Sequence, residues 1–152
     1  EAATTVRLAQ ASPKFIAVKE ASGDMVQAMT IMRDKPEHFL VLSGDDPTAL
    51  PLIACGGDGL ISVIGNAFPR EYGRMVHAAL QGRQSEARQW NDLFIDFHPW
   101  LYIDGNPAGI KLTLSQLGLC STELRLPLTP MHEFNAEALQ KRLSQIQAKL
   151  SA

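Results

Sequence analysis

Short apolar runs alternate with amphipathic stretches through the first half of the chain. The apolar runs are rich in strand-forming residues and bounded by polar or glycine-containing segments, and they predict strands at residues 15–19, 39–42 and 60–64. Apolar residues at three- and four-residue spacing predict helices around them, at about 1–8, 24–33, 47–53 and 70–80. Strands and helices are therefore expected to alternate along this part of the chain.

The strand-helix order predicts an α/β fold with a parallel sheet covered on both faces, as in doubly wound or barrel folds. After Gly82 the alternation ends, and only helices are predicted, at about 85–102, 108–117 and 136–150. We therefore expect two parts, a strand-helix part at 1–82 and a helical part at 83–152.

Three strands cannot close a barrel, since a (β/α)8 barrel takes about 250 residues. The chain is thus expected to be either a small open sheet or the later part of something larger. Its first residues already have a helical pattern with no capping residue before them, so further chain is expected ahead of Glu1.

Composition narrows the classes of function. The 152 residues are 45% hydrophobic with a formal charge of -2, which suits a globular domain without the basic surplus of a nucleic-acid binder. No apolar window approaches the ~18 residues of a membrane span, so a cytoplasmic protein is expected. Cys55 and Cys120 have no metal-ligand spacing and are expected to be buried thiols, and neither a metal nor a cofactor is predicted.

Lys19 ends the first apolar run, and a charged amine is unexpected directly after four residues typical of a buried strand. One interpretation is structural: the stem packs on the rim of the sheet and the ammonium reaches water. The other is chemical. An amine among apolar neighbours loses part of its solvation, which favours the neutral form that attacks a ketone carbonyl to make a Schiff base.

Two glycine-containing segments stand next to the predicted strands. The first holds Gly44, which would allow a substrate carboxylate to approach the backbone closely, although a tight turn also asks for glycine. Its neighbours Asp45 and Asp46 are expected to cap the next helix. The second, 56–59 (GGDG), precedes its strand and therefore lies at the opposite end of the sheet, where a tight turn is the better interpretation than a phosphate loop.

Several segments together resemble the dihydrodipicolinate synthase family, class I aldolase-like (β/α)8 barrels related to N-acetylneuraminate lyase. They occur in the family's order along almost the whole chain: 16–23 (IAVKEASG), 42–46 (LSGDD), 56–63 (GGDGLISV), 106–111 (NPAGIK) and 124–130 (LRLPLTP). The resemblance implies the carboxyl-terminal half of a TIM barrel, strands six to eight, followed by an α-helical extension.

The resemblance also implies roles for three residues. Lys19 would form the Schiff base with pyruvate at the end of strand six. Gly44 and Ile61 would stand at the ends of strands seven and eight and contribute main-chain groups around the pyruvate-derived part of the substrate. The family's catalytic tyrosine, its threonine partner and its substrate-binding arginine belong to the first half of the barrel, so no residue of this chain matches them.

The family reaction condenses pyruvate with L-aspartate 4-semialdehyde to a hydroxy-tetrahydrodipicolinate in lysine and diaminopimelate biosynthesis, and the full-length enzymes usually form homotetramers. Half a barrel is expected to be weak or inactive by itself. Two alternatives stay open. In one, the same imine chemistry serves other acceptors, as in N-acetylneuraminate lyase and keto-deoxy sugar acid aldolases. In the other, the half-barrel is a non-enzymatic binding or assembly module.

Overall fold

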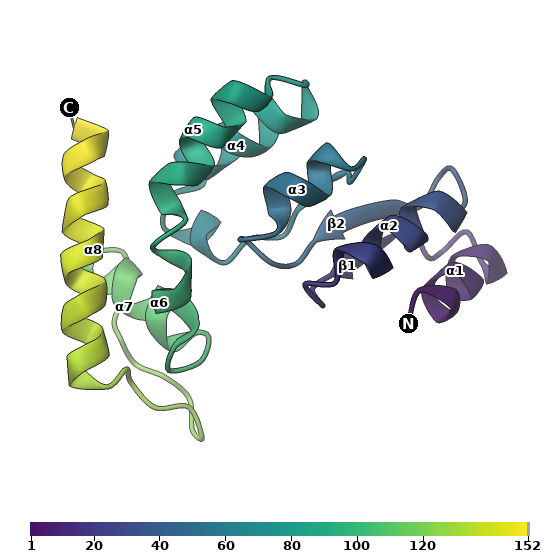
Figure 1. The fold of residues 1–152 in the computed structure, drawn as a ribbon. Helices are drawn as coiled ribbons and strands as arrows, with labels where there is room; N and C mark the ends of the chain where they lie inside the picture. Colours follow the sequence, from purple (N-terminus) through teal and green to yellow (C-terminus); the bar gives the residue numbers. More distant parts are fainter. Residues whose placement is uncertain (152) are drawn as a thin grey trace. The chain divides into compact units, whose positions relative to one another are not determined.

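The computed structural model describes residues 1–151 and divides the chain into two compact units. The sheet unit comprises Glu1–Val63 and Gly73–Gln89, and the helical unit comprises Ile64–Tyr72 and the chain from Trp90 onward. Two helices, α4 (Pro69–Leu80) and α5 (Gln84–Phe94), each contribute residues to both units (Figure 1).

The sheet unit alternates helices and strands as the sequence predicts. Its elements in chain order are α1 (Ala2–Ala11), β1 (Ala17–Glu20), α2 (Met25–Asp34), β2 (Leu40–Ser43), α3 (Ala49–Ala54) and β3 (Gly59–Leu60). The strands form one parallel sheet in the order β1-β2-β3. The predicted α/β alternation is therefore confirmed for this unit.

Local sequence sets the limits of α2. The Asp24 carboxylate accepts hydrogen bonds from the backbone N–H groups of Val26 (2.9 Å) and Gln27 (3.0 Å), two of the donors that a helix start leaves unpaired. The helix ends before Lys35, which is extended (φ -66°, ψ 152°) because Pro36 disfavours helical geometry in the residue before it.

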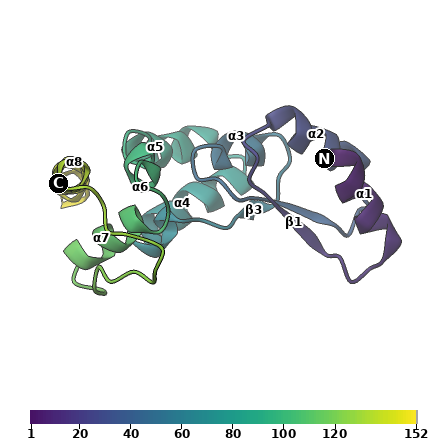
Figure 2. The same cartoon turned by 90° about the horizontal axis from the view of Figure 1, so that it is seen from below.

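One face of the sheet carries the core of this unit. Val18 of β1 and Val41 of β2 pack with Ile31 of α2, and Ala9 and Phe39 complete the cluster. Figure 2 shows α2 and α3 on the same side of β1 and β3.

Alternate strand residues point to the opposite face, where Leu40 is 41% exposed. The predicted covering of both faces is therefore wrong for the sheet unit as described. Its own helices cover the face of Val18, and its own residues leave the face of Lys19 open.

The third strand is shorter than the predicted 60–64. It ends at Leu60, and the chain reaches a 3-10 helix, η1 (Ile64–Asn66), within four residues. The strand does not continue because the Ser62 hydroxyl and the Val63 N–H donate hydrogen bonds to the Asp46 carboxylate.

The helical unit contains α6 (His98–Tyr102), α7 (Ala108–Gln116) and α8 (Glu133–Ser151). The predicted single helix at 85–102 is two helices, α5 and α6, because Pro99 lacks the N–H that a continuous helix needs there. A buried aromatic cluster forms the core, with Phe68 and Phe94 ring centroids 5.1 Å apart. Within it the Tyr72 hydroxyl lies 3.1 Å from Nε2 of His98.

The prediction of buried thiols is wrong, because Cys55 and Cys120 are both exposed. Cys55 directly follows α3 and precedes Gly56, and Cys120 lies two residues after the glycine that ends α7. Both stand in connections between elements, and such segments run over the surface.

A core substitution tests the cluster beneath β1. Ile31 is 0% exposed, so Ile31→Val should lower the free energy of unfolding by about 1 kcal/mol through the lost methylene and the remaining space. Val26 lies on the same helix but is 69% exposed, and Val26→Ala should change it by less than about 0.5 kcal/mol. Urea denaturation of both variants measures this, and equal effects would contradict the assignment of the buried face.

A pH-dependent contact joins the start of α8 to the α6–α7 loop. Hydrogen bonds from the Asn135 amide (2.8 Å) and the His132 backbone N–H (2.9 Å) hold the pKa of the Asp104 carboxyl below its ordinary value of 3.8. A lowered folded-state pKa gives stability that is present above the ordinary value and lost as the pH falls through the folded-state value.

Asp104→Asn should therefore destabilise the protein at pH 7 and cost less at pH 2 to 3, as measured by urea midpoints at both pH values. Glu137→Gln, which removes a carboxylate from an exposed position of α8, is the matched control and should show no comparable dependence. An Asp104→Asn deficit that is unchanged between the two pH values would refute the contact's electrostatic role.

Candidate functional site

The strand register places Lys19 in a defined row of the sheet. Lys19 of β1 stands opposite Leu42 of β2, which in turn stands opposite Gly59 of β3. Because Val18 points to the helices, Lys19 points to the opposite face, and its side chain is exposed in the sheet unit. The apolar surroundings expected from the sequence are therefore not supplied by β1 and its neighbours alone.

Two residues further along each strand, and one residue past each strand end, the register brings Ala21, Gly44 and Ile61 into one row. The Gly44 N–H donates to the Glu20 carbonyl at 2.7 Å, and the Ile61 N–H donates to the Ser43 carbonyl at 2.8 Å. These bonds continue the parallel ladder by one step beyond each strand end. The three predicted site residues are thus brought to the carboxyl end of one sheet.

Gly44 lies directly against the Lys19 side chain. A Cβ atom at Gly44 would lie 2.8 Å from Cγ and 2.9 Å from Cε of Lys19, and 2.7 Å from Cβ of Ala21. The missing side chain therefore makes room for the lysine stem. The sequence suggested instead that Gly44 lets a substrate carboxylate approach the backbone. Both roles require the absence of a side chain at Gly44, so they are compatible.

Ile61 can offer a ligand only one of its two main-chain polar groups. Its N–H donates to Ser43, which leaves the carbonyl oxygen as the group that can face a bound molecule. Its side chain is 47% exposed and so is not part of the core of the sheet unit. The role predicted for Ile61 through its main chain therefore reduces to hydrogen-bond acceptance.

The two aspartates after Gly44 do different things. Asp45 does not cap α3 as predicted, because its carboxylate accepts from the Thr48 hydroxyl (2.9 Å) and the N-cap position, Thr48, has no side-chain cap bond. Asp46 does not cap α3 with its side chain. Its carboxylate turns to the chain after β3 and accepts from the Ser62 hydroxyl (2.5 Å) and the Val63 N–H (3.0 Å). The local pattern could not reveal this, because the partners are 16 and 17 residues away.

The 56–59 segment leads into the amino end of β3, and its interpretation as a turn is confirmed. Gly56 and Gly59 have positive φ values of 106° and 151°. Asp58 exchanges bonds with Val41, its N–H donating to the Val41 carbonyl and its carboxylate accepting from the Val41 N–H. The segment thus joins the amino end of β3 to β2, with Asp58 beside Val41 and Gly59 in the row of Lys19.

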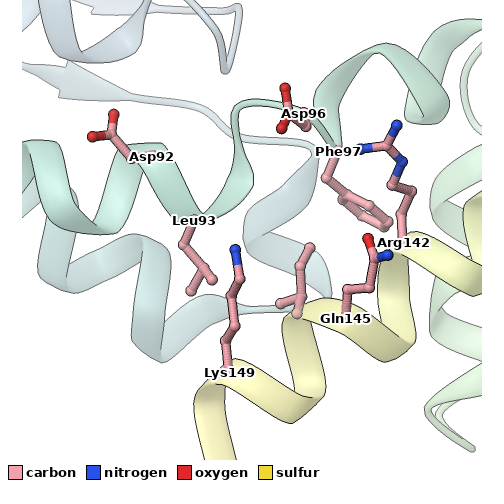
Figure 3. A pocket seen from close by; sticks show the side chains of 8 residues that line it. Asp92, Leu93, Asp96, Phe97, Arg142, Gln145 and Lys149 are labelled. Carbon is pink, nitrogen blue, oxygen red and sulfur yellow. The ribbon is translucent and has the colours of Figure 1, made fainter.

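Residues 1–151 contain no group of three potential metal ligands and no helix long and apolar enough to cross a bilayer. A small hollow of about 50 Å³ occurs in the helical unit, where Arg142, Gln145 and Lys149 project from α8 near Leu93 and Phe97 (Figure 3). It contains none of the predicted site residues, so the candidate site remains the carboxyl end of the sheet.

Comparison with known proteins decides the family. The family described as the dihydrodipicolinate synthetase family matches residues 1–146. The chain belongs to this family. A 4-hydroxy-tetrahydrodipicolinate synthase from Phocaeicola vulgatus is 45% identical to it over 148 residues, which are 97% of this chain and 50% of that relative.

Solved structures agree with this assignment to the dihydrodipicolinate synthetase family. The 4-hydroxy-tetrahydrodipicolinate synthase from Methylacidiphilum fumariolicum SolV is similar with a TM-score of 0.95 at 35% identity, over 99% of this chain and 50% of that one. A chloride-inhibited dihydrodipicolinate synthase from Acinetobacter baumannii, complexed with pyruvate, has a TM-score of 0.92 at 33% identity, over 97% and 50%. The chain thus spans about half the length of the curated relatives and solved structures that it matches.

The contact between Gly44 and Lys19 predicts opposite effects for two glycine substitutions. Gly44→Ala would push a methyl group into Lys19 and Ala21 and should lower the free energy of unfolding by about 1–3 kcal/mol. At Gly73, inside α4, an added Cβ meets nothing within 4 Å, so Gly73→Ala should raise it by about 0.5–1 kcal/mol. Urea denaturation gives both values, and a Gly44→Ala variant as stable as the unsubstituted protein would show that the lysine stem does not occupy this space.

Proposed function

We propose that this chain carries the imine-forming half of a pyruvate-dependent Schiff-base lyase, with Lys19 as the amine. The observation that carries the proposal is the position of Lys19 beside Gly44 and Ile61 at the carboxyl end of a parallel sheet, the end where barrel enzymes hold their active sites. Family membership and a similar structure solved with pyruvate support it.

Under this proposal β1, β2 and β3 are strands six, seven and eight of a (β/α)8 barrel, and the helices after them form an extension. The division into a barrel part at 1–82 and an extension at 83–152 is part of the same proposal. The open face that carries Lys19 and Leu40 would be the barrel interior. The chain spans half the length of its relatives, so the other strands of such a barrel have no counterpart among its residues.

The chemistry follows from the amine. The Lys19 nitrogen adds to the keto carbon of pyruvate, and loss of water leaves an iminium. This cation draws electrons from the adjacent methyl carbon, which gives up a proton and becomes an enamine. The enamine carbon then forms a bond to an aldehyde carbon, whose oxygen takes up a proton, and the iminium forms again. Addition of water, or of the acceptor's own amine, to the iminium carbon displaces the Lys19 nitrogen and returns the free amine. The Ile61 carbonyl would lie near the pyruvate-derived part throughout.

The proposed acceptor is L-aspartate 4-semialdehyde, and the proposed product is 4-hydroxy-tetrahydrodipicolinate, on the route to lysine and diaminopimelate. The names of the relatives support this choice over the neuraminate lyase and keto-deoxy sugar acid aldolase alternatives. The same relatives are enzymes by name, which favours an enzyme over a non-enzymatic half-barrel module. No cofactor is needed for the imine chemistry, because the protein supplies the electron sink itself.

The sheet unit lacks two things that such a reaction needs. Lys19 is exposed, so water is not excluded around it, and no tyrosine of the chain matches the family's proton relay. Proton transfer by a placed acid or base is worth about 10²- to 10⁴-fold in rate. The 152 residues alone should therefore be weak or inactive as a synthase.

We further propose small-molecule substrates, a cytoplasmic location and a homotetramer of the full-length kind, with no nucleic acid or membrane as partner. One similar solved structure, 28% identical with a TM-score of 0.92, is a monomeric dihydrodipicolinate synthase variant.

Borohydride trapping tests the proposal. Incubation of the protein encoded by the complete reading frame with pyruvate and borohydride should add a reduced pyruvyl group to Lys19, as located by intact-mass and peptide analysis. Lys19→Arg keeps the charge but should give no adduct, whereas Lys14→Arg, a change at an exposed lysine outside the strand, should label normally. If the unsubstituted protein takes up no pyruvyl group, Lys19 is an ordinary strand-end lysine and the proposed function fails.

A further inference from the structure

Asp46 is a buried acidic side chain that the imine chemistry leaves unused. It is 1% exposed, and charged groups are almost never so deeply buried unless they are paired or hydrogen-bonded. Both carboxylate oxygens accept hydrogen bonds, Oδ1 from the Ser62 hydroxyl at 2.5 Å and Oδ2 from the Val63 N–H at 3.0 Å. The two donors directly follow Ile61 in the chain.

These bonds replace a strand ladder at the point where the ladder stops. β3 ends at Leu60, and the last ladder bond is the one from the Ile61 N–H to the Ser43 carbonyl. Beyond it, Ser62 and Val63 are attached to β2 through Asp46, three residues past the end of that strand. The chain around Ile61 is therefore held from both sides, by the backbone of Ser43 before it and by the Asp46 carboxylate after it.

This attachment decides where the Ile61 carbonyl points. The carbonyl belongs to the peptide unit between Ile61 and Ser62, which is planar, so the orientation of Ser62 and the orientation of the carbonyl are linked. The same turn carries Gly44, against which the Lys19 stem lies. Asp46 thus links two parts of the candidate site: the turn with Gly44, against which the Lys19 stem lies, and the Ile61 carbonyl, which can accept a hydrogen bond.

We propose that Asp46 is a positioning residue for the Schiff-base site, which holds the Ile61–Val63 segment so that the Ile61 carbonyl faces the pyruvate-derived part of the substrate. The inference rests on the proposed function of Lys19. Asp46 itself does not touch the reacting atoms. It acts through Ser62 and Val63, and its effect should be seen in imine formation as well as in stability.

The test is Asp46→Asn in the protein encoded by the complete reading frame. The amide keeps the size of the side chain but loses the charge and replaces one acceptor oxygen by an N–H donor, so the bonds to Ser62 and Val63 are weakened and the Ser62 hydroxyl must reverse to accept or lose its bond. A displacement of about 1 Å at a reacting site costs up to ~10²-fold in rate. The rate of pyruvate-dependent borohydride labelling of Lys19, per folded molecule, should fall by about 10- to 100-fold, and amide exchange at Val63 should become faster.

Asp58 offers a matched control at the amino end of β3. Its carboxylate also accepts a backbone N–H across the sheet, that of Val41 at 2.8 Å. Asp58→Asn makes the same chemical change and weakens this bond, because a neutral amide oxygen accepts more weakly than a carboxylate, so it should lower the urea midpoint without changing the Lys19 labelling rate per folded molecule. A purely structural role for Asp46 predicts the same outcome for both variants.

The outcomes separate the two ideas. Slow Lys19 labelling in Asp46→Asn together with normal labelling in Asp58→Asn supports the positioning role. Normal labelling in both variants overturns it while leaving the function of Lys19 intact. The absence of labelling in the unsubstituted protein overturns both. If Asp46→Asn does not fold, Ser62→Ala removes the hydroxyl bond alone, and a labelling rate equal to that of the unsubstituted protein then refutes the role.

Discussion

The parallel register of β1, β2 and β3 is the constraint on which the rest of the sheet unit depends. Side chains alternate between the two faces of a strand, so the pairing of Lys19 with Leu42 decides that both point away from the helices. A slip of one residue would turn Lys19 into the cluster of Val18, Val41 and Ile31 and would bring a valine to the open face. Packing on one face and chemistry on the other are two results of the same pairing.

The helices secure that register from behind the sheet. Val41 and Ile31 are fully buried, and burial of an aliphatic side chain of this size contributes about 1.5–3 kcal/mol. A slipped strand would lose this burial and would place a charged amine in the core, which costs several kcal/mol more unless it is paired. The buried cluster and the Lys19 amine are thus connected, because side chains alternate between the two faces along β1.

The ends of the strands are held by side chains as much as by backbone. Asp58 bonds to the backbone of β2 at the amino end of β3, and Asp46 bonds to the chain after β3. Both are carboxylates that accept from a backbone N–H seventeen residues away in sequence. Where a short parallel strand cannot continue its ladder, a carboxylate can satisfy the next donors and still allow the chain to turn.

The sequence by itself determined the alternation of strands and helices, the strand-end position of Lys19, and the turn at 56–59. These are local properties, set by apolar periodicity and by glycine, and long-range contacts did not overturn them. The family resemblance was also visible in short segments, and residues 1–146 match that family.

Only the tertiary structure decided the rest. The length of β3 depends on Asp46, whose partners lie 16 and 17 residues away, and the use of Gly44 depends on the Lys19 stem of another strand. The exposure of both cysteines likewise went against the pattern, whereas the break between α5 and α6 follows from Pro99 in the sequence. A pattern of apolar residues states which side chains prefer burial, whereas hydrogen-bond partners and close contacts between strands are fixed only when the strands are packed together.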